Sequence, residues 1–538
     1  MFLWYMKLID FHTHPLLKPV NSSLDVSKIE NIWKEFPEPE TCRQLNFFIR
    51  EAIKSTDKLS QSDFTKVTRG DVNGIFIAMG PAERPFFHPK ITRWYVHGIL
   101  PSWDYKKLAR SVTGFCMDKV DSIFKRIKEK KGIDYFNEEL LPEFQYLLSQ
   151  EKNTSIPNKF KIAKNYSEFK HIIDNEPDTT VVVLTVEGAH SFGNFSNDDF
   201  TIDYDKVNEP ANYTKYKKIY LDNIKTVKQN WGDHTPFFVT LCHHFWNLLS
   251  GHSKSMSPSG AIIPGMDAII DQLPNLNKPM TEVGKDVVKE LLSRQNGRRI
   301  LIDVKHMSVE SRKWYYRYVK EQRDKEDNIP IICSHTSVNL FETMDDAARE
   351  SDSFDKDKDR YLSSFSINLS NDEIKEIADS KGIIGIILNE GRMPGELGRK
   401  AIKACGKGMS DAKRDVYLKL ILCNIMQIIK VVNTKEAWDL ICIGSDFDGV
   451  IDPFETYMDA RTLKDLPIHI MQYLSNPQFD LDWIGVTAND IKTKYMFDYN
   501  AQDIGKKIAS KNIMLFLERY FYDGYLKNSS NIGNNIIP

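Results

Sequence analysis

The sequence has few cysteines, no long apolar run and no excess of charge of either sign. Its 7 cysteines are an odd number spread over 538 residues, which excludes a small disulfide-stapled scaffold. No window contains the ~18 uninterrupted apolar residues of a membrane span. Lys and Arg total 72 and Asp and Glu total 74, so the net charge is only −2. This balance provides no basic field that would hold nucleic acid or an anionic membrane.

The two ends of the sequence also lack targeting patterns. Residues 1–12 are apolar, but they have no basic region and no small-residue cleavage site, so we expect no signal peptide. The last residues, NSSNIGNNIIP, are unlike a lipid-anchor signal. We expect the cysteines to be buried, reduced thiols, as in a reducing compartment. The sequence therefore predicts a cytoplasmic protein with neither a membrane nor a nucleic-acid partner.

The apolar residues that are present are gathered in eight short runs with strand character. Hydrophobic residues make up 41% and charged residues 27% of the chain, close to the average of globular domains. Continuous apolar runs of this length are typical of strands buried on both faces, as in a parallel sheet. The runs are residues 6–11, 74–79, 180–186, 237–242, 300–305, 329–334, 383–388 and 439–445.

Amphipathic helical segments lie between several of these runs. Residues 283–295 precede the fifth run, and residues 309–322 follow Ser308, a favourable N-cap. Residues 371–381 begin after Ser370, with Glu373 placed to complete a capping box. Eight strands that alternate with helices predict an α/β fold, a (β/α)8 barrel of the TIM type. An open doubly wound sheet also fits the alternation.

The gaps between the runs are uneven. Residues 15–70, 80–178 and 190–235 are far longer than an ordinary connection between a strand and a helix. We interpret them as insertions on the barrel, with residues 80–178 as a candidate cap over its mouth. The charge-rich residues 350–360 are expected to form a solvated loop.

Residues with metal-ligand chemistry follow the apolar runs. The first run leads into His12 and His14, whose side chains share a face because alternate residues of a strand point to the same side. In a (β/α)8 barrel the carboxyl ends of the strands form the active-site face. The residues that follow five later runs are Glu187, His243, His306, His335 and Asp446.

Each of these residues has an ordinary explanation by itself. Glu187 precedes a glycine and could be a solvated turn residue, and His335 could be a buried structural histidine. Asp446 lies near Gly449 and could be a turn former. Their joint position at the ends of six runs nevertheless favours a metal centre. Imidazole and carboxylate ligands suit Zn²⁺, and two ions bridged by a carboxylate would form a hydrolytic site.

The remaining histidines are expected to have other roles. We expect supporting or surface positions for His190, His244 and His252, which lie near the candidate ligands in the sequence. Five more histidines do not follow a strand-like run and are interpreted as structural: His88, His97, His171, His234 and His469.

The strand-end motifs resemble the membrane dipeptidase (renal dipeptidase) family of the amidohydrolase superfamily. The matching segments are DFHTH, VEGAH, TLCHHFWN, LIDVKHMS, IICSHTS, LSNDEIKEIADSKGIIGI and IGSDFDGV, and they occur in the family order. The resemblance implies one metal-dependent hydrolase barrel over residues 1–538. Against that family, residues 15–70, 80–178 and 340–366 are unusually long insertions.

The resemblance also implies a role for each motif residue. His12 and His14 would bind one metal, His306 and His335 would bind the second, and Glu187 would bridge the two. Asp446 would be the general acid and base. His243 would contact the substrate and stabilise the tetrahedral intermediate, with Asn247 among the substrate-binding residues.

The cofactor that the resemblance implies is a pair of zinc ions, or another divalent metal. The implied partners are a small-molecule or dipeptide substrate and, as for many family members, a second copy of the chain.

Two positions depart from the family pattern. The family usually has H-x-D where this chain has His12-Thr13-His14, and it has an arginine for the substrate carboxylate where this chain has Ile367. Arg360 or Arg349, from the inserted segment, are candidates to replace that arginine. A missing guanidinium would remove bidentate recognition of a carboxylate.

The leading hypothesis from the sequence is therefore a binuclear zinc-dependent hydrolase that cleaves the amide bond of dipeptides or similar small substrates. A second hypothesis is an amidohydrolase that acts on a non-peptidic amide, ester or lactone, motivated by His14 and Ile367. A third, of another class, is a non-catalytic scaffold or binding protein stabilised by metal.

Overall fold

The computed structural model describes residues 6–37, 59–87, 102–153, 159–255, 270–350 and 357–528 of the chain. Eight parallel strands follow one another in chain order around a sheet, and each overlaps one of the eight predicted runs. The strands are β1 (Ile9–Thr13), β2 (Gly74–Met79), β5 (Thr179–Glu187), β7 (Phe238–Thr240), β8 (Leu301–Asp303), β9 (Ile332–Thr336), β10 (Ile383–Ile386) and β11 (Ile441–Ile443).

The first and last strands meet and close the sheet into a barrel. Thr13 forms a parallel bridge with Phe447, just beyond β11. The Asp446 N–H donates to the His12 carbonyl at 3.0 Å, and the His14 N–H donates to the Phe447 carbonyl at 2.8 Å. The predicted (β/α)8 barrel is confirmed, and the alternative of an open doubly wound sheet is excluded because the two edges pair with each other.

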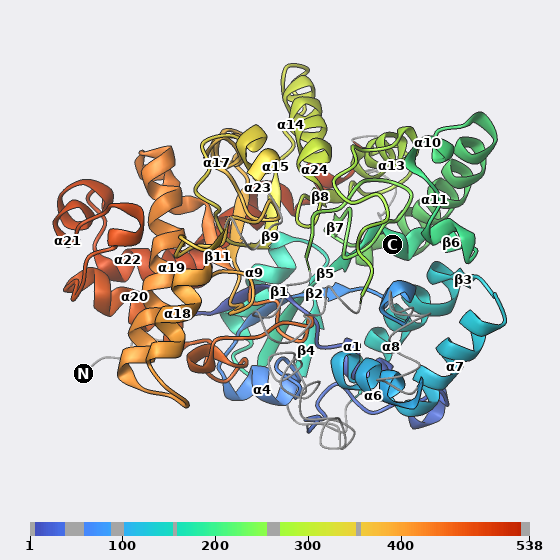
Figure 1. Ribbon diagram of the computed structural model, residues 1–538, viewed down its shortest axis with the longest axis horizontal. Helices are drawn as coiled ribbons and strands as arrows, with labels where there is room; N and C mark the ends of the chain where they lie inside the picture. The colour runs from blue at the N-terminus through green and yellow to red at the C-terminus, as the bar shows by residue number, and fades with distance from the viewer. Residues whose placement is uncertain are drawn as a thin grey trace, which may run out of the picture.

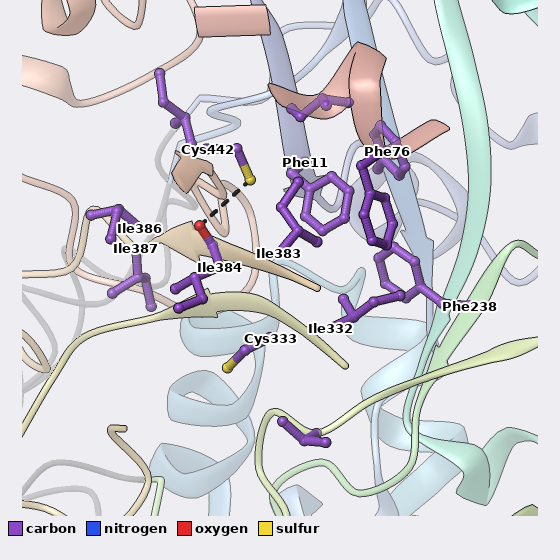
Figure 2. Close-up of a cluster of buried hydrophobic side chains, with 14 of the residues drawn as sticks. Phe11, Phe76, Phe238, Ile332, Cys333, Ile383, Ile384, Ile386, Ile387 and Cys442 are labelled. Carbon is purple, nitrogen blue, oxygen red and sulfur yellow. Dashed lines mark hydrogen bonds between the residues drawn. The ribbon is translucent and has the colours of Figure 1, made fainter. Parts of the chain in front are cut away.

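Bulky side chains fill the centre of the barrel. Phe11, Phe76 and Phe238 pack ring to ring, with centroids 4.5 Å apart for Phe11–Phe76 and 5.4 Å apart for Phe11–Phe238 (Figure 2). β1 and β7 are not neighbours in the sheet, so this contact crosses the interior. Figure 2 shows Ile332 and Ile383 beside the aromatic group. The barrel is therefore a packed core that holds the strand ends in fixed positions.

Helices surround the strands (Figure 1). They are α1 (Leu17–Val20), α4 (Phe64–Arg69), α6 (Ser102–Thr113), α7 (Met117–Lys128), α8 (Leu141–Glu151), α9 (Tyr166–Asn175), α10 (Tyr204–Val207), α11 (Pro210–Asn230), α13 (Glu282–Leu292), α14 (Val309–Arg323), α15 (Met344–Glu350), α17 (Asn371–Asp379), α18 (Glu396–Ala404), α19 (Asp411–Val432), α20 (Asp465–Ser475), α21 (Ala488–Asp490), α22 (Ala501–Lys506), α23 (Asn512–Tyr520) and α24 (Asp523–Leu526).

The predicted helix starts are confirmed by their caps. Ser308 accepts a hydrogen bond from the Ser311 N–H at 3.2 Å and starts α14. Ser370 and Glu373 form a capping box at the start of α17, in which the Ser370 N–H donates to the Glu373 carboxylate at 3.1 Å. These caps satisfy backbone groups that have no partner within a first helical turn.

The long insertion after β2 folds into helices with a core of their own. A separate apolar cluster joins Phe87 and Tyr105 of the insertion to Phe245, which lies two residues after His243. α6 and α7 therefore pack beside the loop that follows β7. Figure 1 shows α6, α7 and α8 together at one side of the barrel. Residues 88–101 of the predicted cap lie outside the described residues.

Three short strands have no counterpart among the predicted runs. β4 (Lys159–Ile162) pairs with the first half of β5, and β3 (Ile133–Asp134) pairs with β6 (Asn194–Phe195). β4 reads KFKI, with Lys159 and Lys161 exposed and Phe160 and Ile162 buried. Such a segment is too short and too polar to appear as a continuous apolar run.

Two further observations bear on the sequence predictions. No helix among the described residues is long and apolar enough to cross a membrane. Six cysteines are free thiols, and four of these are buried: Cys242, Cys333, Cys423 and Cys442. Cys42 lies outside the described residues.

Candidate metal centre

The two histidines after β1 form the first half of the centre. His12 and His14 point their Nε2 atoms at each other, 3.1 Å apart. A bulge interrupts the register of β1 against β2 between Asp10 and Thr13, at the point where these side chains turn inward. His12 is fully buried and His14 is 6% exposed. The strand-end position thus brings both imidazoles to one point, as predicted.

The second half comes from the opposite side of the barrel. His306, which follows β8, and His335, in β9, place their Nε2 atoms 3.3 Å apart. Both side chains are buried. His306 has a φ of +67°, a left-handed backbone conformation that is uncommon for a non-glycine residue. Strain of this kind persists where the surrounding structure imposes it, which is common at functional sites.

Glu187, at the end of β5, lies between the two histidine pairs. Its Oε1 atom is 3.4 Å from His12 Nε2, 3.5 Å from His306 Nε2 and 3.6 Å from His335 Nε2. Its Oε2 atom is 3.0 Å from His14 Nε2. Although Glu187 is buried, its Oε1 atom has no hydrogen-bond partner. A buried carboxylate oxygen without a donor, facing three imidazole nitrogens, is the environment expected of a bridging metal ligand.

Asp446 adds a second carboxylate that reaches both halves. Its Oδ1 atom is 3.4 Å from His14 Nε2, and its Oδ2 atom is 3.9 Å from His335 Nε2. Asp446 has a φ of +62° in the loop after β11, where Asp448 and Val450 also have positive φ. Asp448 fixes this loop, since its carboxylate accepts hydrogen bonds from the Gln61 and Ser62 N–H groups at 3.0 and 2.8 Å.

The donor set fits divalent metal ions. Two imidazole nitrogens on one tetrahedral zinc ion, each bound at about 2.0–2.1 Å, lie about 3.3 Å apart. The two histidine pairs have Nε2 separations of 3.1 and 3.3 Å. His12, His14, Glu187 and Asp446 form one group of converging potential ligands, and Glu187, His243 and His306 form another. His12, His14, Glu187, His306 and His335 are the residues that would hold a pair of metals.

Buried carboxylates orient the candidate ligands and their segments through hydrogen bonds. The Ser334 Oγ atom lies 2.8 Å from His335 Nδ1 and donates to Asp303 at 2.6 Å, so a hydroxyl links this histidine to a carboxylate. Asp10 accepts from the Ser445 N–H at 2.9 Å and ties β1 to the segment that carries Asp446. Partners of this kind orient metal-binding side chains.

The electrostatics of the cluster favour cations. Burial opposes ionisation of Glu187, but the neighbouring imidazoles, His243 first, hold the pKa of its carboxyl well below the usual value. Burial disfavours a charge on His14, yet Glu187 and Asp446 raise its pKa to about 10. Burial lowers the pKa of His306 to about 3. Glu187 is thus ionised and His306 neutral, the states that metal ligation requires, whereas His14 would have to release a proton to bind a metal.

His243 lies at the edge of the same group, with a partner that the sequence analysis missed. Its Nε2 atom is 3.3 Å from Glu187 Oε2, and its Nδ1 atom is 2.9 Å from Glu83 Oε2. Glu83 follows β2 in the motif GPAERP, which contains no pattern that marks it as part of a site.

Asn247 is not placed like a substrate-binding residue. Its side-chain NH2 donates to the Leu241 carbonyl at 2.7 Å, and its Oδ1 atom accepts from the Leu249 and Ser250 N–H groups at 3.1 and 3.3 Å. The fully buried amide holds the loop after β7 in shape. The geometry therefore gives no support to the predicted substrate contact of Asn247.

The other histidines support the loops around the centre. His190 Nε2 lies 2.9 Å from the Pro81 carbonyl, His244 Nδ1 lies 2.6 Å from Ser255 Oγ, and His252 Nε2 lies 2.9 Å from the Gln272 carbonyl. All three are buried, so the alternative of a surface position does not hold for them. His88 and His97 lie outside the described residues.

Two buried cations near the centre were also missed. Lys305 precedes His306 and is 3% exposed, and Arg392, in the loop after β10, is 7% exposed. Burial lowers the pKa of Lys305 to about 8, with the charge of Arg392 acting in the same direction and that of Asp446 against it. Lys305 is thus within electrostatic reach of Asp446, and Arg392 is within reach of Lys305 and His244.

Of the two predicted replacements for the family arginine, Arg360 contacts groups outside the centre. Ile367 is buried. Arg360 donates to the Asn339 carbonyl at 3.3 Å, with its guanidinium carbon 4.4 Å from the centre of the Phe341 ring. The side chain of Arg349 is outside the described part of the structure. Among the described side chains, Lys305 and Arg392 are buried cations near the centre.

Of the known proteins compared with this chain, only solved structures are similar to it. No protein-family model and no curated protein sequence matches the chain. A dipeptidase of metallopeptidase family M19 is 13% identical, with a TM-score of 0.48, and the match covers 96% of this chain and 99% of that one. A Rhodobacter sphaeroides metallopeptidase, solved with a phosphinate mimic of L-Ala-D-Ala, is also 13% identical, with a TM-score of 0.47 and the same coverage of 96% and 99%.

A third similar structure is the probable dipeptidase PvdM from Pseudomonas aeruginosa. It is 15% identical, with a TM-score of 0.43, and the match covers 85% of this chain and 88% of that one.

Proposed function

We propose that the chain is a metal-dependent hydrolase that cleaves the amide bond of dipeptides or similar small substrates with a metal-activated water. The observation that carries the proposal is the environment of Glu187 Oε1, a buried oxygen without a hydrogen-bond donor that faces the Nε2 atoms of His12, His306 and His335. Such an arrangement is costly unless cations lie between the groups. A pair of zinc ions is the cofactor that suits this set of ligands.

The chain's own residues supply the proton transfers. Bound divalent ions would lower the pKa of a water molecule and polarise the scissile carbonyl. Asp446 is placed to take the proton at its carboxylate and to deliver it to the leaving amine, because its two oxygens face opposite histidine pairs. Burial raises the pKa of Asp446, and the charge of Glu187 acts in the same direction. A raised pKa makes this carboxylate a stronger base, which suits a group that takes a proton from water and later releases it.

His243 is placed to act on the substrate oxygen. Its Nε2 atom faces the centre beside Glu187, and its side chain is 16% exposed, whereas that of Glu187 is 2% exposed. A ring nitrogen in this position can hydrogen-bond the oxygen on which negative charge develops. Lys305 and Arg392 provide positive charge that suits a substrate with a free carboxylate, in place of the arginine that Ile367 replaces.

The test is turnover of a small substrate panel by zinc-loaded protein, with metal-stripped protein as the control. The panel contains a dipeptide, its C-terminal amide, an N-acyl amino acid and a lactone at equal concentration. We expect metal-dependent cleavage of the dipeptide and weaker cleavage of its amide, since the amide lacks the carboxylate. Preference for the lactone or the amide would favour the non-peptidic hydrolase. No cleavage of any substrate, with two metals bound per chain, would favour the non-catalytic scaffold.

A further inference from the structure

Glu83 is a buried carboxylate that joins the segment after β2 to the loop after β7. It is 3% exposed. Its Oε2 atom accepts from the His244 N–H at 3.1 Å, and its Oε1 atom accepts from the Phe245 N–H at 3.1 Å. The same Oε2 atom lies 2.9 Å from the Nδ1 atom of His243. Glu83 thus contacts three consecutive residues at the end of the strand that carries His243.

The contact between Glu83 and His243 is an ion-pair contact whose N–H direction is not that of an aligned hydrogen bond. Apo sites often have such loose alignments, which tighten when ligands bind. The two ring nitrogens nevertheless face different carboxylates, since Nδ1 is beside Glu83 and Nε2 is 3.3 Å from Glu187. A carboxylate beside Nδ1 favours the tautomer with the proton on that nitrogen, which leaves the Nε2 lone pair directed at the centre.

The segment around Glu83 is held rigidly. The Pro81 carbonyl lies 2.9 Å from His190 Nε2, and the Arg84 N–H donates to the Tyr135 hydroxyl at 2.7 Å. The Tyr135 ring contacts the His190 ring at a centroid distance of 4.9 Å. The chain is therefore anchored on both sides of Glu83, at Pro81 and at Arg84, and the Glu83 carboxylate has little freedom to leave His243.

We propose that Glu83 is a positioning residue for the hydrolase site: it holds the His243 ring by the Nδ1 edge, so that Nε2 is the nitrogen presented beside Glu187 to the substrate. Glu83 itself touches neither the metal ligands nor the reacting atoms. Its effect is transmitted through His243. The consequence for turnover depends on the proposed function, whereas the consequence for the ring tautomer does not.

The first test is the pair Glu83→Gln and Glu143→Gln. The Glu83→Gln side chain keeps one oxygen for the backbone N–H groups but loses the charge beside His243. We expect kcat to fall by about 10- to 100-fold, the range found when partners of site histidines are removed, with KM and metal content nearly unchanged. Glu143 is the matched control, since it is 6% exposed, carries its carboxylate in the same insertion and accepts from the Gly80 N–H at 3.2 Å without touching His243.

The second test separates positioning from a merely structural role. In a His243→Asn background, Glu83→Gln should cost no more than about 2-fold, because the residue through which Glu83 acts is gone. Glu83→Asp, which restores the charge, should recover part of the lost kcat. An equal loss of kcat in both backgrounds, or wild-type kcat in Glu83→Gln, would overturn the proposal.

The third test does not depend on activity. In protein labelled with ¹⁵N-histidine, the His243 signals, assigned by their loss in His243→Asn, should show the proton on Nδ1 in the wild type and a redistribution toward Nε2 in Glu83→Gln. If the wild type cleaves no substrate, this measurement still decides the role of Glu83. Unchanged His243 signals in a folded Glu83→Gln variant would overturn it, whereas Glu83→Asp, which restores the charge, should keep the proton on Nδ1.

Discussion

At the scale of single residues, the centre brings together two pairs of imidazoles whose Nε2 atoms point at each other. His12 and His14 meet at 3.1 Å through their Nε2 atoms, as do His306 and His335 at 3.3 Å. A hydrogen bond within either pair requires one ring to donate from Nε2 and the other to accept there, because a neutral imidazole donates from only one nitrogen. Metal ions bound by these nitrogens would satisfy both pairs at once. Asp446 would then be the carboxylate that remains able to transfer protons.

The first prediction concerns Asp446. In Asp446→Asn the side-chain shape is kept, but the group can no longer accept a proton, so turnover should fall by about 10²–10⁴-fold, the contribution typical of a general base. Metal content, measured by elemental analysis, should stay at the wild-type value because Asp446 is not required to hold either ion. Near-normal kcat in this variant would remove Asp446 from the mechanism.

At the scale of elements, the ends of the strands depend on backbone conformations that the side chains alone do not reveal. Gly188 follows Glu187 and has a φ of +90°. A Cβ atom there would lie 2.2 Å from His190 Nδ1 and 3.2 Å from the Cβ atom of His243. The Glu-Gly pair therefore lets the chain turn sharply after β5 and brings His190 close to the site.

The second prediction compares Gly188→Ala with Gly232→Ala. Gly232 also has a positive φ of +56°, but a Cβ there would have no atom within 4 Å. Gly232→Ala should cost about 1 kcal/mol of unfolding free energy from backbone strain alone. Gly188→Ala should cost about 1–3 kcal/mol more, because His190 must move. Urea unfolding of both variants measures the difference, and equal costs would show that the contact with His190 is relieved without penalty.

The third prediction concerns α8 of the insertion, which carries Glu143. Burial raises the pKa of Glu143 to about 8. Between pH 4.5 and 8 the folded protein therefore keeps a proton that the unfolded chain has lost, so this group makes the fold less stable as the pH rises through that window. Glu143→Gln cannot ionise and should not show this loss.

The difference between wild type and Glu143→Gln should therefore grow with pH. We expect the variant to gain on the order of 3 kcal/mol of relative unfolding free energy from pH 5 to pH 8. The measurement is denaturant unfolding of metal-stripped protein, so that proton-linked metal release does not contribute. A difference that is constant with pH would mean that Glu143 is ionised in the fold at neutral pH.

At the scale of the whole molecule, the candidate ligands come from strands around the full circumference of the barrel. β1, β5, β8, β9 and the segment after β11 each contribute at least one, and hydrogen bonds between residues 12–14 and 446–447 close the circle. Metal ions would therefore stabilise the fold by linking strands that are far apart in the sequence, in addition to any role in catalysis.

The fourth prediction is that metal removal lowers the melting temperature. Two ions, each present at 100 times its Kd, would add about 5 kcal/mol, which for a chain of this size corresponds to about 5 °C. Calorimetry before and after chelation, and after zinc is added back, measures the shift. His335→Asn should reduce the response to zinc, whereas His171→Ala, which removes an exposed histidine of α9, should keep it. No response of the wild type would contradict the assignment of these residues as ligands.

Much of the fold could be read from local pattern. Eight buried parallel strands appear as continuous apolar runs because both faces of each strand are covered, and helix starts appear through Ser308 and Ser370 because caps act within one turn. The candidate ligands could also be predicted from the sequence, since a residue directly after a strand of a closed parallel barrel must lie at the carboxyl end of that strand. Residue types and their spacing relative to the strands therefore determined the barrel, and they predicted the candidate ligands and Asp446.

Other features were decided only by the tertiary structure. Glu83, Lys305 and Arg392 have no local signal, because their roles depend on which strand ends the closed barrel places side by side. The amide of Asn247 serves the backbone, which no pattern of residues 241–250 indicates. Short, half-exposed β4 pairs with β5 only because the barrel provides an edge for it. For Glu83, Lys305, Arg392 and β4 the physical reason is the same: contacts between residues far apart in the sequence depend on distances that exist only after the barrel has closed. Asn247 differs, because its partners Leu241, Leu249 and Ser250 lie in its own loop.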